Sequence, residues 1–125
     1  MALYEKTAAE LSELLAKKEI SAVELAKDVF ARTSAVEDKV PGYVTLAEES
    51  ALAQAEAVDK KRAAGEELSA LAGIPVAIKD NICTKGTLTT CASKVLYNFK
   101  PPYNATVMEK LAAHDVVVTG KANMD

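Results

Sequence analysis

A short apolar run that leads directly into a lysine constrains the fold of this chain more than any other feature. Residues 76–78 are Val, Ala and Ile, they follow Pro75, and Lys79 comes next. An apolar run with a proline only at its beginning is typical of a strand buried on both faces. Asp80 and Asn81 favour a turn directly afterwards. The pattern predicts a short buried strand that ends at Lys79.

A lysine at the end of a buried strand has two explanations. Burial disfavours the charged form of an amine, so an enclosed lysine can accept a proton from a serine or form a Schiff base with a carbonyl compound. Alternatively, the side chain extends to water and keeps its charge. The spacing around Lys79 by itself favours the second explanation.

Two helices are predicted before this strand, and each begins with a capping box. Thr7 with Glu10, and Ser21 with Glu24, have the required spacing. In this motif the hydroxyl accepts a hydrogen bond from the helix backbone and the glutamate reaches back to the capping residue. Apolar residues at helical spacing extend the two helices over about 7–18 and 22–38.

A strand and an alanine-rich helix are predicted next. Residues 43–46 are rich in strand-forming side chains, and they follow the break at Pro41 and Gly42. The helix covers about 48–64 and ends at Gly65. Its expected buried side consists of Leu52, Ala55, Ala57 and Val58.

After Lys79 the pattern changes to a long loop followed by a helix and a second strand. Residues 81–93 are rich in threonine and too irregular for a helix, and Ser93 can cap a turn over 93–97. A helix is predicted over about 105–114, capped by Asn104. Its expected inward side chains are Val107, Leu111 and Ala112. The apolar residues 116–118 then predict a strand parallel to the one that ends at Lys79.

Other candidate sites are weak. Cys83 and Cys91 have the wrong spacing for a redox or zinc motif, and free thiols are the expected state. Residues 119–122 (TGKA) lack the first glycine and the final hydroxyl of a phosphate loop. His114 is expected to cap a helix C-terminus.

Composition excludes several classes of function. The 15 basic and 18 acidic residues give a net charge of −3, so nucleic-acid binding by this segment alone is not expected. No run approaches the roughly 20 apolar residues of a membrane span. No signal peptide is visible, and a cytoplasmic location without a membrane partner is expected.

Residues 71–81 (LAGIPVAIKDN) closely resemble a motif of the amidase signature family. The segments 81–86, 89–94, 98–107 and 120–125 resemble the glutamine-hydrolysing amidotransferase subunits of that family more than its other amidases. The resemblance covers essentially the whole chain. It implies an α/β fold with a mixed sheet between helical layers. Residues 1–125 would be the N-terminal part of a single amidase domain, with a helical region over about 7–65 and the lysine strand with its βα unit over about 71–125.

The resemblance also implies a mechanism based on two serines and a lysine. The family's lysine matches Lys79, which would be the general base and would act through a cis-peptide serine on the nucleophilic serine. Both serines are expected beyond Asp125, so neither is assigned here. The matching residues on both sides of Lys79 reverse the preference that spacing alone gives, and they favour the base.

Partners and cofactors follow from the same resemblance. Such a subunit would release ammonia from glutamine or asparagine, for conversion of Glu-tRNA(Gln) to Gln-tRNA(Gln) with subunits B and C in a heterotrimer. ATP and Mg²⁺ would be used by the partner subunit, and this segment would bind no cofactor. Two alternatives stay open, namely an amidase that acts alone on small amides and a catalytically inert fragment or scaffold.

Overall fold

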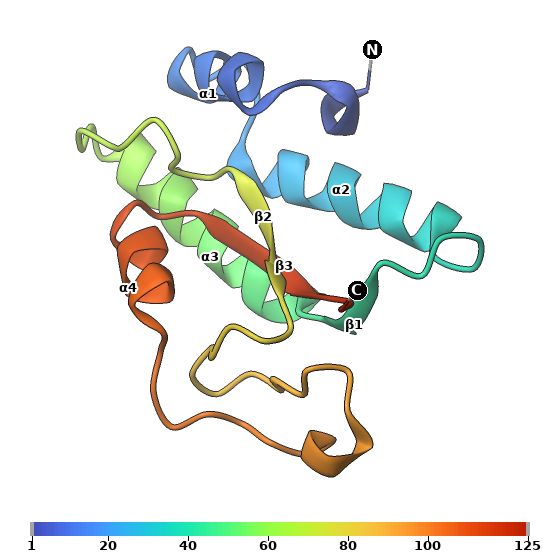
Figure 1. Cartoon of the computed structure of the whole chain (residues 1–125). Helices are drawn as coiled ribbons and strands as arrows, with labels where there is room; N and C mark the ends of the chain where they lie inside the picture. The colour runs from blue at the N-terminus through green and yellow to red at the C-terminus, as the bar shows by residue number, and fades with distance from the viewer. Residues whose placement is uncertain (1, 125) are drawn as a thin grey trace.

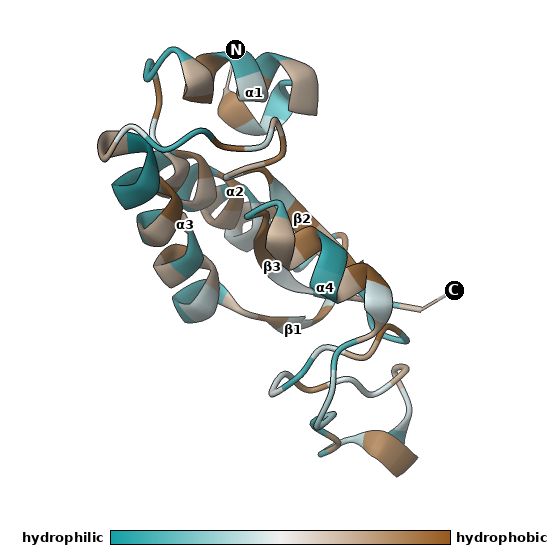
Figure 2. Ribbon diagram, turned by 90° about the vertical axis from the view of Figure 1, so that its left-hand side faces the viewer, coloured by the Kyte–Doolittle hydropathy of each residue, from teal (hydrophilic) through white to brown (hydrophobic). Residues whose placement is uncertain are grey.

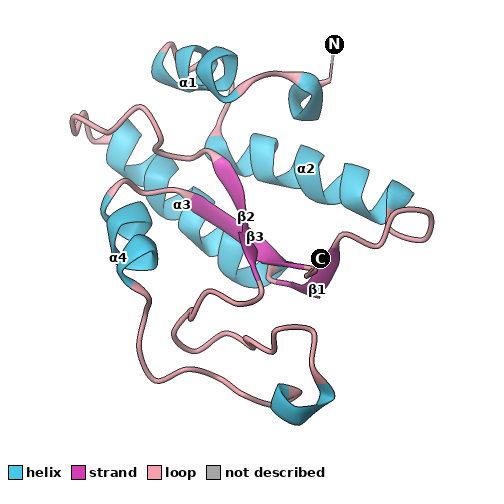
Figure 3. Ribbon diagram, viewed as in Figure 1, coloured by secondary structure: helices cyan, strands magenta, loops and turns pink. Residues whose placement is uncertain are grey.

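Three strands form a mixed sheet in the computed structural model, which describes residues 2–124 (Figures 1 and 3). The strands are β1 (Tyr43–Leu46), β2 (Pro75–Lys79) and β3 (Val117–Ala122), in the order β1-β3-β2. β2 lies parallel to β3, as predicted, whereas β1 is antiparallel to it. Because β3 extends through residues 119–122, this segment is a central strand and forms no phosphate loop.

The helices form where the sequence places their beginnings. They are α1 (Ala8–Ala16), α2 (Ala22–Val36), α3 (Glu48–Ala63) and α4 (Thr106–Ala113), with short 3-10 helices η1 (Leu3–Glu5) and η2 (Lys94–Leu96). In Figure 2, α2 and α3 lie together on one side of the sheet, and α4 lies beside β3. Within residues 2–124, every helix is too short or too polar to cross a bilayer.

Both predicted capping boxes are confirmed. The Thr7 hydroxyl accepts a hydrogen bond from the Glu10 amide at 3.2 Å, and the Glu10 carboxylate accepts one from the Thr7 amide at 2.7 Å. Ser21 and Glu24 make the same pair of bonds at 3.0 and 3.2 Å. These contacts satisfy backbone donors that a helix leaves without partners.

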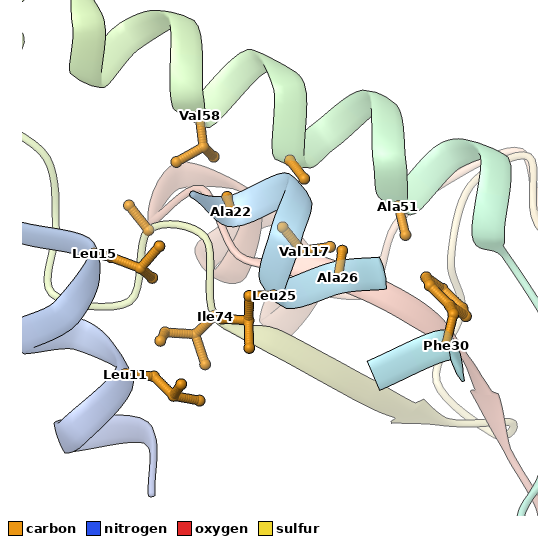
Figure 4. Packing of buried hydrophobic residues seen from close by; sticks show 12 residues of the cluster. Leu11, Leu15, Ala22, Leu25, Ala26, Phe30, Ala51, Val58, Ile74 and Val117 are labelled. Atoms are coloured by element: carbon orange, nitrogen blue, oxygen red, sulfur yellow. The ribbon is translucent and has the colours of Figure 1, made fainter. Parts of the chain in front are cut away.

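The apolar core lies where α1, α2 and α3 meet the beginnings of β2 and β3 (Figure 4). In Figure 4, Ala22 and Ala26 of α2 lie on the side toward α3, near Val58 and Ala51, whereas Leu25 lies beside Ile74. The complete cluster is Leu11, Leu15, Ala22, Leu25, Ala26, Phe30, Ala51, Ala55, Val58, Ala72, Ile74 and Val117. Five of these twelve residues are alanines, and four of the alanines lie on α2 and α3, which lets these two helices approach each other closely.

Gly73 allows the chain to enter β2 next to this core. Its φ of +85° lies in the left-handed region, which L side chains rarely adopt. A Cβ atom at this position would lie 3.1 Å from the Cβ of Ala22, and close to Leu15 and Val58. The backbone conformation therefore favours glycine, and a Cβ atom here would also crowd Ala22.

The predicted burial of β2 on both faces is wrong. Ile78 is buried, but Val76 and Pro75 are only half-buried and Ala77 is exposed. The reason is that β2 is an edge strand of the three-stranded sheet, with only β3 beside it. An apolar run does not show how many neighbours a strand will have.

Parts of the predicted helix faces are also wrong. In α3, Ala51 is buried with Ala55 and Val58, whereas Ala57 is exposed and Leu52 is half-buried. In α4, Met108 is the buried residue, whereas Val107 and Ala112 are exposed and Leu111 is half-buried. In α3 the alanines are spread around the helix and leave no clear apolar stripe, so tertiary packing decides which face is buried.

Asn104 does not cap α4. Ala105 occupies the capping position, and the Asn104 side-chain oxygen accepts a hydrogen bond from the Lys85 amide at 2.8 Å. This contact ties the beginning of α4 to the loop that follows β2. The long-range partner replaces the local one that the sequence predicts.

Candidate active site

Lys79 ends β2, at the carboxyl edge of the parallel β2–β3 pair. Its Cα is paired with that of Ala122 near the end of β3, and its side chain is half-buried. The Lys79 carbonyl accepts a hydrogen bond from the Ile82 amide at 3.0 Å, which closes the turn predicted there. The carboxyl ends of parallel strands are where open α/β sheets place their functional groups.

Asp80 follows Lys79 directly, and its side chain is fully buried. Its Oδ2 atom accepts hydrogen bonds from the Thr90 hydroxyl at 2.6 Å, the Thr90 amide at 3.1 Å and the Ala92 amide at 3.3 Å. Its Oδ1 atom is also buried, and no partner for it is found within residues 2–124. A carboxylate with three donors on one oxygen holds the segment around Thr90 firmly against the end of β2.

The segment that Asp80 holds has an unusual backbone. Cys91 and Ala92 have φ values of +53° and +54°, in the left-handed region that costs energy for residues other than glycine. The Cys91 amide donates to the Asp80 carbonyl at 3.0 Å, so main chain and side chain of Asp80 both contact this turn. The contacts to Asp80 offset the strain of the two residues.

Lys121 is a second lysine at this edge, and it has no exposed surface. Its ammonium donates to the Ile82 carbonyl at 2.6 Å, the Thr84 hydroxyl at 2.8 Å and the Thr89 hydroxyl at 3.1 Å. Burial lowers the pKa of Lys121, while the nearby Asp80 carboxylate acts in the opposite direction. Three acceptors match the three donors of an ammonium, so the buried group is fully hydrogen-bonded.

Sequence reasoning missed Lys121 as a buried group. The signal was available, because Lys121 also stands near the end of an apolar strand and the loop before it is rich in threonine hydroxyls. The partial likeness of residues 119–122 to a phosphate loop points to a different role for this lysine. Which threonines converge on the ammonium depends on how the loop folds, and the sequence does not specify that.

The remaining candidate residues have structural contacts. Ser93 caps η2, as predicted, by accepting a hydrogen bond from the Val95 amide at 3.2 Å. His114 ends α4, and its Nδ1 atom lies 2.8 Å from the Ser69 hydroxyl. Cys83 and Cys91 are free thiols. Cys83 lies 3.5 Å from the Tyr103 hydroxyl, and this contact raises the pKa of Tyr103.

No group of three or more histidine, cysteine, aspartate or glutamate side chains that could hold a metal ion is found among residues 2–124. The site consists of a half-buried lysine on a strand end, with two fully buried charged groups beside it. A lysine in such a place can accept and return a proton if a hydroxyl nucleophile is brought to it.

Comparison with known proteins shows relatives of this chain. The family model described as Amidase matches residues 24–125. The chain is 56% identical over 125 residues to the A subunit of the glutamyl-tRNA(Gln) amidotransferase of Desulforamulus reducens, and the match covers 100% of this chain and 26% of the relative. The protein of the same name from Natranaerobius thermophilus is 52% identical, with the same coverage. The chain therefore spans about a quarter of the length of these relatives.

A solved structure supports the fold. The peptide amidase of Stenotrophomonas maltophilia matches with a TM-score of 0.89 and 28% identity, over 96% of this chain and 25% of the amidase. The expected fold class, an α/β arrangement with a mixed sheet, is confirmed by this match and by the strand pairing.

Proposed function

The chain belongs to the amidase family, and on this premise we propose that Lys79 is the general base of an amide-hydrolysing site. The observation that carries the proposal is the position of Lys79 at the carboxyl end of β2, inside the segment 71–81 that resembles the family motif. Its direct neighbour Asp80 is buried and bound to the following loop. These contacts hold the backbone at the end of β2, next to Lys79, in one position.

In the proposed reaction, protons pass between Lys79 and two serines, and an oxygen atom replaces the amide nitrogen at the carbonyl carbon. Neutral Lys79 takes a proton from a bridging serine, which takes one from the nucleophilic serine, and the serine oxygen bonds to the amide carbon. The carbon–nitrogen bond then breaks, and the nitrogen leaves as ammonia with the returned proton. Water then attacks the acyl carbon and gives a proton to the serine oxygen, whose bond to that carbon breaks, so the acid product leaves and the serine is restored. Both serines would come from outside these 125 residues.

We propose glutamine, with asparagine as the second candidate, as the substrate of the complete protein. The relatives named as A subunits of glutamyl-tRNA(Gln) amidotransferase support this choice, since they match this chain along its full length. Ammonia released here would serve to convert Glu-tRNA(Gln) to Gln-tRNA(Gln) in the cytoplasm. Subunits B and C would complete the heterotrimer, with ATP and Mg²⁺ used in the partner subunit.

A second candidate function is an amidase that acts alone on small amides. The structural match to a peptide amidase favours it, because that relative shares the fold of this segment at 28% identity. Association with partner subunits in a pull-down, and ammonia release from glutamine rather than from other amides, distinguish the two functions. The 125-residue chain by itself is proposed to be inactive, because it supplies a base without an assigned nucleophile.

The test uses a full-length protein in which this chain replaces the matching segment of the Desulforamulus reducens relative. Lys79→Ala is expected to abolish ammonia release from glutamine while the protein stays folded. Lys85→Ala is the matched control, since Lys85 is an exposed lysine of the following loop. Hydrolysis at the parental rate by the Lys79→Ala protein would remove Lys79 from the mechanism.

A further inference from the structure

We propose that Lys121 is a positioning residue, which fixes Lys79 by holding the loop that leaves the end of β2. The proposal rests on the proposed function, since it gives Lys79 the role of general base. Lys121 itself is fully enclosed, and its ammonium binds Ile82, Thr84 and Thr89. It therefore acts on the site through the loop and not through a substrate.

Burying the ammonium of Lys121 costs free energy. A charged group moved out of water is strongly destabilising unless its donors are all used. Lys121 meets this condition with acceptors from Ile82, Thr84 and Thr89. An apolar side chain would fill the same space without that requirement, so the ammonium is best explained by what it holds in place.

The acceptors of Lys121 lie in the loop that directly follows β2. Ile82 is three residues after Lys79, and its amide donates to the Lys79 carbonyl at 3.0 Å. The Ile82 carbonyl accepts from Lys121 at 2.6 Å. The backbone of Ile82 thus connects the buried ammonium to the backbone of the base. Thr84 and Thr89 extend the contact along the loop.

The register of β2 and β3 determines on which face of the sheet each lysine lies. The Cα of Lys121 is paired with that of Ile78, the residue before Lys79. Paired residues on neighbouring strands have side chains on the same face, and successive residues alternate. Lys121 and Lys79 therefore extend from opposite faces of the sheet. The ammonium of Lys121 therefore holds the turn from the face of the sheet opposite to Lys79.

Asp80 holds a later part of the same loop, around Thr90. It binds Thr90 and Ala92, whereas Lys121 binds Thr84 and Thr89. The first half of the loop, through Ala92, is thereby attached next to Lys79. The attraction between the Asp80 carboxylate and the Lys121 ammonium also favours a loop that stays attached to the end of β2.

The first experiment replaces Lys121 by methionine in the full-length protein described above. Methionine fills the space without donors, so the loop can shift although the core stays packed. Because a displacement of about 1 Å can cost about 100-fold in rate, we expect kcat for glutamine to fall by about 100-fold, with KM within about threefold of the parent. A parental kcat in this variant would overturn the proposal.

The second experiment separates positioning from stability. The triple variant Lys121→Met/Thr84→Val/Thr89→Val also removes the two hydroxyls that the single variant leaves without a donor. Its thermal unfolding midpoint should return part of the way toward that of the parent, because the two buried hydroxyls are removed, while the Ile82 carbonyl, which accepts from both Lys121 and Thr84, stays without these donors. Its kcat should stay low. Recovery of kcat together with the unfolding midpoint would show a purely structural role and overturn the proposal.

A milder variant keeps the test decisive if the Lys121 variants do not fold. Of the three contacts to Lys121, Thr89→Val removes the longest, at 3.1 Å, together with the hydrogen bond that the Thr89 hydroxyl donates to the Thr87 carbonyl at 3.1 Å. It should lower kcat by about three- to tenfold at unchanged KM, whereas Thr87→Val, in the same loop but outside the Lys121 contacts, should not. Equal kcat values for both variants would contradict the proposal. Lys79→Ala measured in parallel identifies a failure of the proposed function, because only that failure leaves Lys79→Ala active.

Discussion

The helical part of the chain and the loop after β2 are held in place by different interactions. Twelve buried apolar side chains, from α1 to β3, pack against one another at the helical side. The loop over residues 80–105 extends away from this core in Figure 1, and it is held by the buried charges of Asp80 and Lys121. In Figure 4 the sticks of the core are all carbon atoms, without a polar partner among them.

This difference matters for function because the two kinds of interaction constrain geometry differently. Apolar packing stabilises roughly in proportion to the area removed from water, and it tolerates substitutions that keep the volume. Hydrogen bonds to a buried charge fix the direction and distance of particular atoms. Lys79 stands at the border between the two regions, where β2 leaves the core and enters the loop.

The largest effect on stability is expected in the helical core. Leu25 of α2 has no exposed surface and lies at the centre of the cluster. Leu25→Ala should lower the free energy of unfolding by about 2–5 kcal/mol, because it removes buried apolar surface and leaves a cavity. Urea denaturation of the 125-residue chain measures the change.

Leu71→Ala is the control for that experiment, since Leu71 is 40% exposed. Its effect should stay within about 0.5 kcal/mol. Equal losses from the two substitutions would contradict the assignment of the core to the contacts between α2, α3 and the sheet.

A smaller but more local effect is expected from the buried carboxylate. Asp80→Asn keeps the size of the side chain but removes the charge that accepts from Thr90 and Ala92. It should cost about 1–3 kcal/mol of unfolding free energy, as expected when a buried hydrogen-bonded charge is lost. Amide hydrogen exchange should accelerate at Thr90 and Ala92 in particular.

Asp38→Asn, at an exposed aspartate after α2, should change neither unfolding nor exchange at those two amides. If Asp80→Asn lowered protection uniformly over α2 and α3, the division into two separately held regions would be wrong. Loss of protection mainly in the loop would support the division into two separately held regions.

The two regions also differ in how far their sequence predicts them. The capping boxes at Thr7 and Ser21 involve residues three positions apart, so local spacing is sufficient, and both helices follow. The parallel pairing of β2 with β3 follows from the order of strand, helix and strand. The position of Lys79 at the end of β2 is predicted as well, whereas its chemical role stays a prediction.

The loop is not predictable in the same way because its contacts are long-range. Lys121 reaches residues 82, 84 and 89, and Asn104 reaches Lys85 instead of capping α4. Ala77 is exposed because β2 has only one neighbour, which is a property of the sheet and not of the strand. Each of these errors concerns a partner far away in the sequence.

The smallest effect is expected from a polar contact on the helical side, at the exposed cap of α1. The Thr7 amide, which donates to Glu10, lowers the pKa of the Glu10 carboxyl below its ordinary value of 4.5. A carboxyl whose pKa is lowered in the folded state binds protons more weakly there than in the unfolded chain. Its contribution to stability is therefore present above pH 4.5 and disappears as the pH falls through the lowered pKa.

Glu10→Gln removes this titration, and the stability difference between parent and variant should shrink as the pH falls from about 7 to about 3, as measured by thermal unfolding. Glu13→Gln, at an exposed glutamate of the same helix, serves as the control for the general loss of negative charge. A difference that stays constant over this pH range would show that the ionised Glu10 does not support the cap. Because the contact is local and surrounded by water, hydrogen exchange at Thr90 and Ala92 in the loop should not respond to Glu10→Gln, in contrast to Asp80→Asn.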